Sequence, residues 1–158
     1  MTPYILTGDL VPPDVGKDLE TTRDFLALLP DPTEKLAPAT ARQHGDDTLY
    51  LWSCHGIVRA LATVLSQPWE VMDGWFLRRG NQHAWLYLEV DNDHRSQFIL
   101  DAYPVAAVGG PLLVDVRPYG SPWQDAYIER RMAFTRAVRE KFDEEGHQAL
   151  RLYKKGVG

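Results

Sequence analysis

Only one of the 158 residues is a cysteine, so the chain cannot form an internal disulfide or supply a cysteine cluster for zinc. A long apolar run is also missing, because no stretch approaches the roughly 18 apolar residues of a membrane span. The first residues lack a basic segment followed by an apolar run, so no secretory signal is visible. These absences lead us to expect a cytoplasmic protein, or one exported without a classical signal peptide.

Positive charge is scarce as well. The chain has 17 lysine and arginine residues against 22 aspartate and glutamate residues, which gives a net charge of −5. Nucleic-acid binding requires a basic face, so we expect no nucleic-acid partner, and we expect no membrane partner either. The five histidines are scattered and lack a metal-ligand spacing such as HExxH. We therefore expect no metal site and no other cofactor.

Apolar residues, in contrast, are plentiful. Hydrophobic residues make up 44% of the chain, which is typical of a folded protein and not of a disordered one. The length falls within the usual range for one globular unit. We expect residues 1–158 to form a single domain.

The spacing of the apolar residues predicts helices first, then a sheet, then a closing helix. Residues 1–16 are rich in proline and glycine and are expected to be an extended lead-in. The predicted helices cover residues 18–29, 54–66 and 122–146, and the predicted strands cover residues 70–77, 83–90, 97–103 and 112–117. This order favours an α+β fold, with N-terminal helices packed on an antiparallel β-sheet and a C-terminal helix.

Cys54 begins the second predicted helix, and Ser53 is a suitable N-cap for it. A thiol attacks an amide or ester only as the thiolate. The N-terminus of a helix supplies partial positive charge, and its free N–H groups can bind the oxyanion of a tetrahedral intermediate. Cys54 is therefore a candidate nucleophile, with a small buried core residue as the alternative.

A nucleophilic cysteine requires an imidazole as its base and a third group that orients the imidazole. His83 begins a strand whose alternate residues are apolar, and Asp101 lies in an apolar strand where an unpaired carboxylate is costly. A turn at residues 91–93 would pair Leu86 with Phe98 and place His83 directly opposite Asp101. His55 adjoins Cys54, but neighbouring helical residues point in different directions, so we rank it below His83.

This pattern resembles the core of the transglutaminase-like superfamily, in which a cysteine heads a helix, a histidine lies on a strand and an aspartate lies on the next strand. The similar pieces are His-x-Trp at 83–85 and Leu-Asp-x-x-Pro at 100–104. The resemblance covers residues 50–104. It implies a papain-like fold with its core over about residues 50–118 and a catalytic triad of Cys54, His83 and Asp101.

Papain-like enzymes often complete the oxyanion hole with a side-chain donor from upstream of the cysteine. Gln43 is the nearest candidate for this donor, and an ordinary surface loop residue is the alternative. Trp52 and Trp85 are candidates to line the substrate cleft, and packing in the core is the alternative for Trp52.

The resemblance implies an enzyme that attacks amide bonds through a thioester on Cys54. We expect a hydrolase that is either a cysteine peptidase or a protein-glutamine deamidase or amidohydrolase. Its expected substrate is a peptide or a protein, and a glutamine side chain is one candidate for the group that reacts. Small papain-like domains of this kind are also found among bacterial effectors, which is an analogy at the level of fold. The alternatives are a transglutaminase-type acyltransferase and a non-catalytic interaction or immunity-type domain that keeps the papain-like fold.

Overall fold

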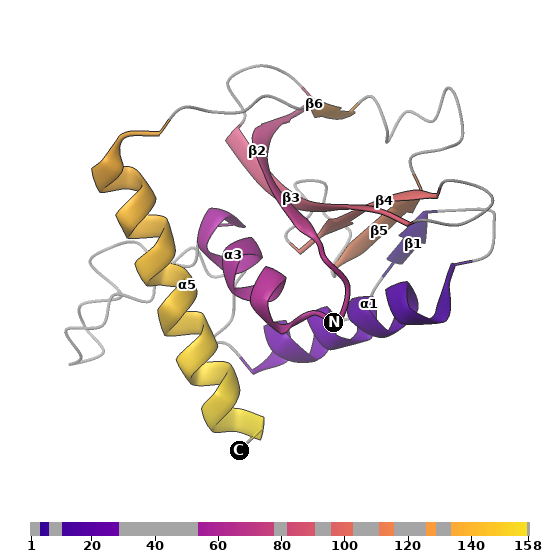
Figure 1. Ribbon diagram of the computed structural model, residues 1–158, viewed down its shortest axis with the longest axis horizontal. Coiled ribbons are helices and arrows are strands. Elements are labelled where there is room, and N and C mark those ends of the chain that lie inside the picture. The colour runs from indigo at the N-terminus through magenta and orange to yellow at the C-terminus, as the bar shows by residue number, and fades with distance from the viewer. Residues whose placement is uncertain are drawn as a thin grey trace.

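The described parts of the chain have an α+β architecture (Figure 1). The computed structural model describes residues 4–6, 11–28, 54–77, 82–90, 96–102, 111–115, 126–128 and 134–157. The helices are α1 (Pro13–Ala27), α3 (Cys54–Val64) and α5 (Arg136–Val157). The strands are β1 (Tyr4–Leu6), β2 (Glu70–Phe76), β3 (Gln82–Glu89), β4 (Gln97–Asp101), β5 (Leu112–Asp115) and β6 (Tyr127–Ile128).

Within the described residues, the strands form one six-stranded sheet in the order β1-β5-β4-β3-β2-β6. From β2 to β5, each strand pairs in antiparallel with the next strand along the chain, as short connections favour. This confirms the predicted antiparallel sheet. The edges were not predicted: β1 pairs in parallel with β5, and β6 pairs in antiparallel with β2.

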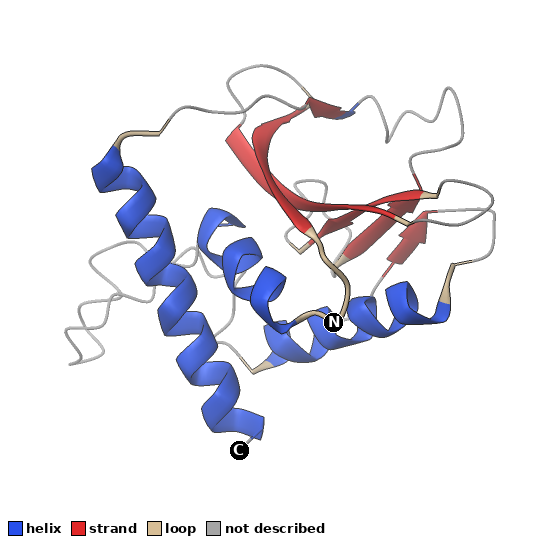
Figure 2. Cartoon of the chain, in the orientation of Figure 1, coloured by secondary structure: helices blue, strands red, loops and turns tan. Residues whose placement is uncertain are grey.

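All three described helices lie on one face of the sheet (Figure 2). On this face Leu86, Leu100 and Leu113 form a buried cluster with helix residues such as Phe25 of α1 and Leu61 of α3. The other face carries a second buried cluster, whose members are Phe76, Trp85, Ile99, Leu112, Val114, Ala126 and Tyr127. Side chains alternate between the faces of a strand, so the two clusters interleave along β3, β4 and β5.

A buried carboxylate fixes the short connection between α3 and β2. Asp18 of α1 is 1% exposed, and its two oxygens accept hydrogen bonds from the backbone N–H groups of Ser66 and Gln67, the Ser66 hydroxyl and the Trp69 indole. These four donors satisfy the buried charge. The chain therefore reverses direction directly after α3, and α1 holds the reversal in place.

The helix α1 starts earlier than the sequence predicted, so the expected extended lead-in over residues 1–16 is wrong from Pro13 onward, whereas Tyr4–Leu6 is extended as strand β1. Proline is suited to the first helical position because its fixed φ is already helical and the N–H that it lacks would have no partner there. Asp14 in the first turn adds a favourable charge at the positive end of the helix.

The predicted C-terminal helix over residues 122–146 is wrong at both ends. Tyr127–Ile128 forms β6, and α5 starts at Arg136 and continues through Gly146 to Val157. Gly146 does not end the helix, because it lies where α5 touches α3. A Cβ at Gly146 would lie 3.1 Å from the carbonyl oxygen of Gly56. Glycine therefore serves close helix packing here and not a helix cap.

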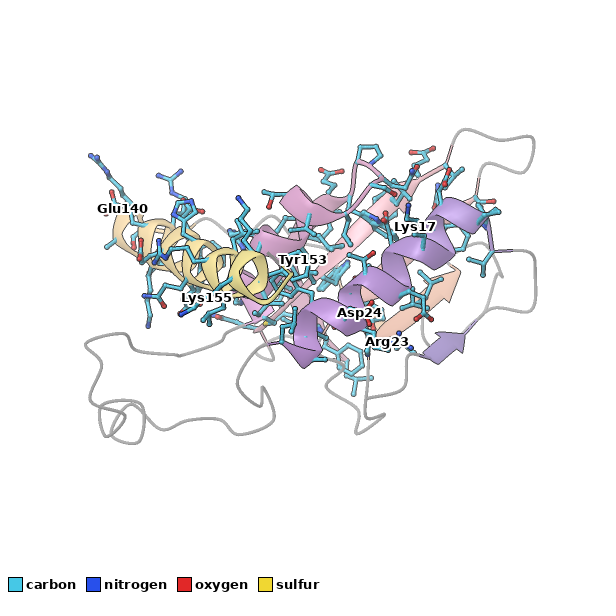
Figure 3. The ribbon with its side chains drawn as sticks, turned by 90° about the horizontal axis from the view of Figure 1, so that it is seen from below. Lys17, Arg23, Asp24, Glu140, Tyr153 and Lys155 are labelled. Carbon is cyan, nitrogen blue, oxygen red and sulfur yellow. The ribbon has the colours of Figure 1, made fainter. Side chains whose placement is uncertain are left out.

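The far end of α5 reaches α1, where the rings of Tyr153 and Phe25 lie 4.9 Å apart (Figure 3). Charged residues occupy the outer surface of α5, and Arg136 and Glu140 form an exposed ion pair at 3.0 Å. None of the described helices is long and apolar enough to cross a membrane.

The predicted register between β3 and β4 is wrong by two residues. The structure pairs Leu86 with Leu100 and not with Phe98, and the N–H of Val90 donates to the Ser96 carbonyl at 2.7 Å. The loop is therefore longer than the predicted three-residue turn. A shift of two residues leaves every side chain on its predicted face, because the strand repeat is two. His83 thus shares a face with Asp101 but is not directly opposite to it.

The close contact between α3 and α5 predicts a large cost for a single methyl group. A Cβ at Gly56 would lie 2.6 Å from Cβ of Glu145, so Gly56→Ala is expected to lower the free energy of unfolding by about 1 to 3 kcal/mol, measured by urea denaturation. Gly16→Ala in α1 is the matched control, because its Cβ would meet only Val11 at 3.9 Å. This control should leave stability unchanged or raise it by up to about 1 kcal/mol. Equal effects of the two substitutions would contradict the packing argument.

Candidate active site

The chain topology brings the first residue of α3, the start of β3 and the end of β4 to the same end of the molecule. Since α3 packs against β2 and β3 and leads into β2 by a short connection, it runs antiparallel to β2. Its first turn therefore lies beside the end of β2, where β3 begins (Figure 1). Because β4 is antiparallel to β3, the end of β4 lies there too. Cys54, His83 and Asp101 occupy these three positions.

The side chains of His83 and Asp101 form a direct hydrogen bond. His83 Nε2 lies 2.8 Å from Asp101 Oδ2, and the exposed fractions of the two side chains are 3% and 0%. The diagonal relation of the two residues is within reach of an imidazole and a carboxylate on neighbouring strands. With Nε2 bound to Asp101, Nδ1 is the ring nitrogen left for another partner.

Cys54 lies close enough to the His83 ring to act on it, because hydrogen bonding and charge from the Cys54 side chain both raise the pKa of His83. Cys54 is partly exposed, whereas the imidazole and the carboxylate behind it are buried. The three residues that the sequence analysis singled out thus meet in the order sulfur, imidazole, carboxylate. Cys54 is the member of the three that is partly exposed.

Burial alone would lower the pKa of His83, but the hydrogen bonds and charges of Asp101 and Cys54 outweigh it and raise that pKa from 6.5 to about 10. His83 is consequently a cation at neutral pH in the resting protein. A cation next to the Cys54 sulfur stabilises the thiolate form of the thiol.

Tyr127 is a member of the site that sequence analysis missed. Its hydroxyl donates a 2.8 Å hydrogen bond to Asp101 Oδ2, the same oxygen that binds His83. Burial, the charge of Asp101 and this hydrogen bond all raise the pKa of Tyr127, so the phenol stays protonated. Its sequence position was assigned to a helix, whereas pairing of Tyr127 with Phe76 holds it on the edge of β2.

Within the part of the chain that the structure describes, three aromatic rings surround the His83 imidazole. The ring centroids of Phe76, Trp85 and Tyr127 lie 5.8, 6.0 and 6.4 Å from it. All three aromatic residues are buried, so they keep water from this side of the pair formed by His83 and Asp101. In such surroundings a hydrogen bond to a charged group is stronger than in water.

Trp85 is therefore buried at 2% exposure and covers His83, and it does not line an open cleft as proposed for it from sequence. The reason is its position on β3, two residues after His83 and on the same face of the strand. Gln43 and Trp52, the other two residues expected near an oxyanion hole or cleft, lie outside the described residues.

A second cluster, which we call the α3 anchor, joins His55 and Arg59 of α3 to Asp73 of β2. His55 Nδ1 lies 2.7 Å from Asp73 Oδ1, and Arg59 donates to both oxygens of Asp73 at 3.2 and 2.9 Å. Burial would raise the pKa of Asp73, but the hydrogen bonds from His55 and Arg59 lower it below 3.8. The anchor therefore includes an ionised carboxylate.

Helix α5 packs on the α3 anchor from outside. Phe142 stacks on the His55 ring at a centroid distance of 4.5 Å, and the Arg59 guanidinium lies 5.3 Å from the Phe142 ring. Nδ1 of His55 is bound to Asp73 and the ring is stacked on Phe142, which supports its lower rank as a base for Cys54. The anchor fixes the first turn of α3 and thereby the position of the neighbouring Cys54.

No protein-family model matches the chain, and no match was found among curated proteins or solved structures. Among the described residues, no group of three or more histidine, cysteine, aspartate or glutamate side chains is arranged to hold a metal ion. The geometry around Cys54 is accordingly the basis for assigning a function.

The raised pKa of His83 predicts a definite pH dependence of stability. Below pH 6.5 His83 is protonated in both the folded and the unfolded chain, so its stabilising contribution is fully present there. As the pH rises toward about 10, only the folded protein keeps the proton, and the contribution is lost by up to about 1.4 kcal/mol per pH unit. The stability difference between wild type and His83→Gln, measured by urea denaturation, should therefore shrink from pH 6.5 to about 10. A constant difference would contradict the assigned interactions.

The α3 anchor predicts that Asp73→Asn lowers the free energy of unfolding at pH 7 by about 1 to 3 kcal/mol, because the buried partners lose their counter-charge. The stabilisation by the Asp73 charge is present above pH 3.8 and is lost as the pH falls through the lowered pKa. Chemical denaturation at neutral and acid pH measures this difference. The control is Asp24→Asn, which breaks an exposed 3.0 Å pair with Arg23 and should cost less than about 1 kcal/mol. An equal cost for the two substitutions would contradict the role of the anchor.

Proposed function

We propose that the protein is a thiol-dependent amide-bond enzyme of the papain-like type, with Cys54 as nucleophile, His83 as acid and base, and Asp101 as the residue that orients His83. The observation that carries the proposal is the contact of a partly exposed thiol with an imidazole whose second nitrogen is bound to a buried carboxylate. A cysteine that only fills the core does not require such partners.

The reaction would proceed in two steps. The Cys54 thiolate attacks the amide carbon, and the backbone N–H groups at the head of α3 are suited to bind the oxyanion that forms. His83 gives its proton to the departing amine, the carbon–nitrogen bond breaks, and a thioester remains on Cys54. His83, now neutral, takes a proton from water, the resulting hydroxide attacks the thioester, and the Cys54 thiolate leaves as the acid product forms. The imidazolium and thiolate are then restored.

Hydrolysis is favoured over cross-linking because water needs no binding site of its own. The substrate would be a peptide or a protein, cleaved at the backbone if the enzyme is a cysteine peptidase. If the enzyme is a protein-glutamine deamidase or an amidohydrolase, the substrate would react at a glutamine side chain or another amide. An acyltransferase of the transglutaminase type would form the same thioester and pass the acyl group to an amine.

The first test measures the reactivity of Cys54 toward iodoacetamide as a function of pH. The proposal predicts fast alkylation already at about pH 6 and much slower alkylation in His83→Ala, because the imidazolium that stabilises the thiolate is removed. His147→Ala removes an exposed histidine of α5 and serves as the matched control, which should react like wild type. Slow labelling of wild type that rises only at alkaline pH would refute the proposal and favour a non-catalytic interaction domain.

The second test identifies the reaction. Wild type and Cys54→Ser are incubated with cell extract, and mass spectrometry searches for new peptide termini, deamidated glutamines and new isopeptide bonds. The first two products correspond to hydrolysis, and the third corresponds to acyl transfer. Cys54→Ser should lose the activity almost wholly, and Asp101→Asn should lose less because asparagine can still orient an imidazole. Products that form equally with Cys54→Ser would contradict the role of the thiol.

A further inference from the structure

We propose that Tyr127 is a positioning residue of the site, which shares the carboxylate oxygen of Asp101 with His83 and thereby limits the negative charge that the imidazole meets. The inference deepens the proposed function and depends on it for its catalytic consequence. Nothing in the sequence pattern around Tyr127 pointed to this role, because residues 122–146 were expected to form a helix.

The geometry of the shared oxygen carries the proposal. Both the His83 ring and the Tyr127 hydroxyl lie 2.8 Å from the same atom, Asp101 Oδ2. The Asp101 side chain is 0% exposed and Tyr127 is 8% exposed. Two donors on one buried oxygen divide its hydrogen-bonding capacity, so each bond is weaker than it would be alone.

The segment that carries Tyr127 is held in place independently of this hydrogen bond. Tyr127 pairs with Phe76 on the edge of β2, and the Leu77 N–H donates to the Ala126 carbonyl at 2.7 Å. The Tyr127 ring packs against Phe76 and Trp85 at centroid distances of 5.2 Å each. Removal of the hydroxyl alone should therefore leave the ring where it is.

Among the described residues, the groups that can set the charge state of His83 come from three elements. They are Cys54 on α3, Asp101 on β4 and Tyr127 on β6. Asp73 on β2 is paired with Ala84 and not with His83. Its carboxylate is bound to His55 and Arg59. Of these groups, the Tyr127 hydroxyl is neutral and acts on His83 only through Asp101.

A weaker hydrogen bond between His83 and Asp101 favours catalysis. An imidazolium that is held too strongly by a buried carboxylate is a poor acid toward the leaving amine, since proton transfer is most effective when the pKa of the acid lies near the working pH. The Tyr127 hydroxyl weakens the hydrogen bond between Asp101 and His83 without adding a charge. It also donates a hydrogen bond to a fully buried carboxylate oxygen, which requires donors from within the protein.

The experiment follows the protonation of His83 by NMR, which requires no substrate and no activity. The imidazole resonance of His83 is assigned by its absence in His83→Gln, and its titration midpoint is measured in wild type and in Tyr127→Phe. The midpoint should rise by about half a unit or more in Tyr127→Phe, because Asp101 presents more of its charge to the ring. Tyr153→Phe removes the hydroxyl of a half-buried tyrosine in the other cluster and should leave the midpoint unchanged.

A second variant tests the opposite sign. Replacement of Tyr127 by a ring-fluorinated tyrosine makes the phenol a stronger donor, and the His83 midpoint should then fall below that of wild type. A purely structural role for Tyr127 would lower the melting temperature and leave the midpoint in place. An unchanged or lowered midpoint in Tyr127→Phe would overturn the proposal, and this outcome would leave the thiol assignment to its own labelling test.

Discussion

The buried carboxylate of Asp101 is the constraint on which the site depends. A carboxylate with no exposure to water must find donors inside the protein, because a buried oxygen without a hydrogen-bond partner is costly. His83 and Tyr127 are among its partners, and they come from strands on either side of β2. These hydrogen bonds hold the imidazole of β3 beside Cys54 and join β6 to the site.

Two further aspartates fix the positions of the helices through hydrogen bonds. Asp18 ties α1 to the reversal after α3, and Asp73 ties the first turn of α3 to β2 with help from Arg59. Asp73 thus fixes the first turn of the helix that carries Cys54, and Asp18 fixes the connection that follows its last turn. The precision required between a sulfur and an imidazole is thus supplied by polar contacts with defined directions, while the apolar clusters on the two faces of the sheet supply most of the burial energy.

The same polar contacts account for the chemistry that we propose. A thiolate and an imidazolium are stable next to each other when a carboxylate binds the far side of the imidazolium ring and water is excluded from that side. The aromatic rings of Phe76, Trp85 and Tyr127 provide the exclusion, and Tyr127 adds a donor that moderates the carboxylate. Helix α5 contributes indirectly, because its Phe142 packs on His55, the residue next to Cys54.

The sequence by itself determined what depends on local pattern: the helix from Cys54, the strands β2 to β5, the faces of β3 and β4, and the presence of His83 on β3 and Asp101 on β4 on the same face of the sheet. Periodicity is a property of neighbouring residues, so even a register error of two left the faces correct. Only the tertiary structure decided the longer hairpin loop, the strand at Tyr127, the passage of α5 through Gly146 and the pairing of His55 with Asp73. The last three depend on contact with segments distant along the chain, and such contacts override local propensity because they bury polar groups or backbone that must be satisfied.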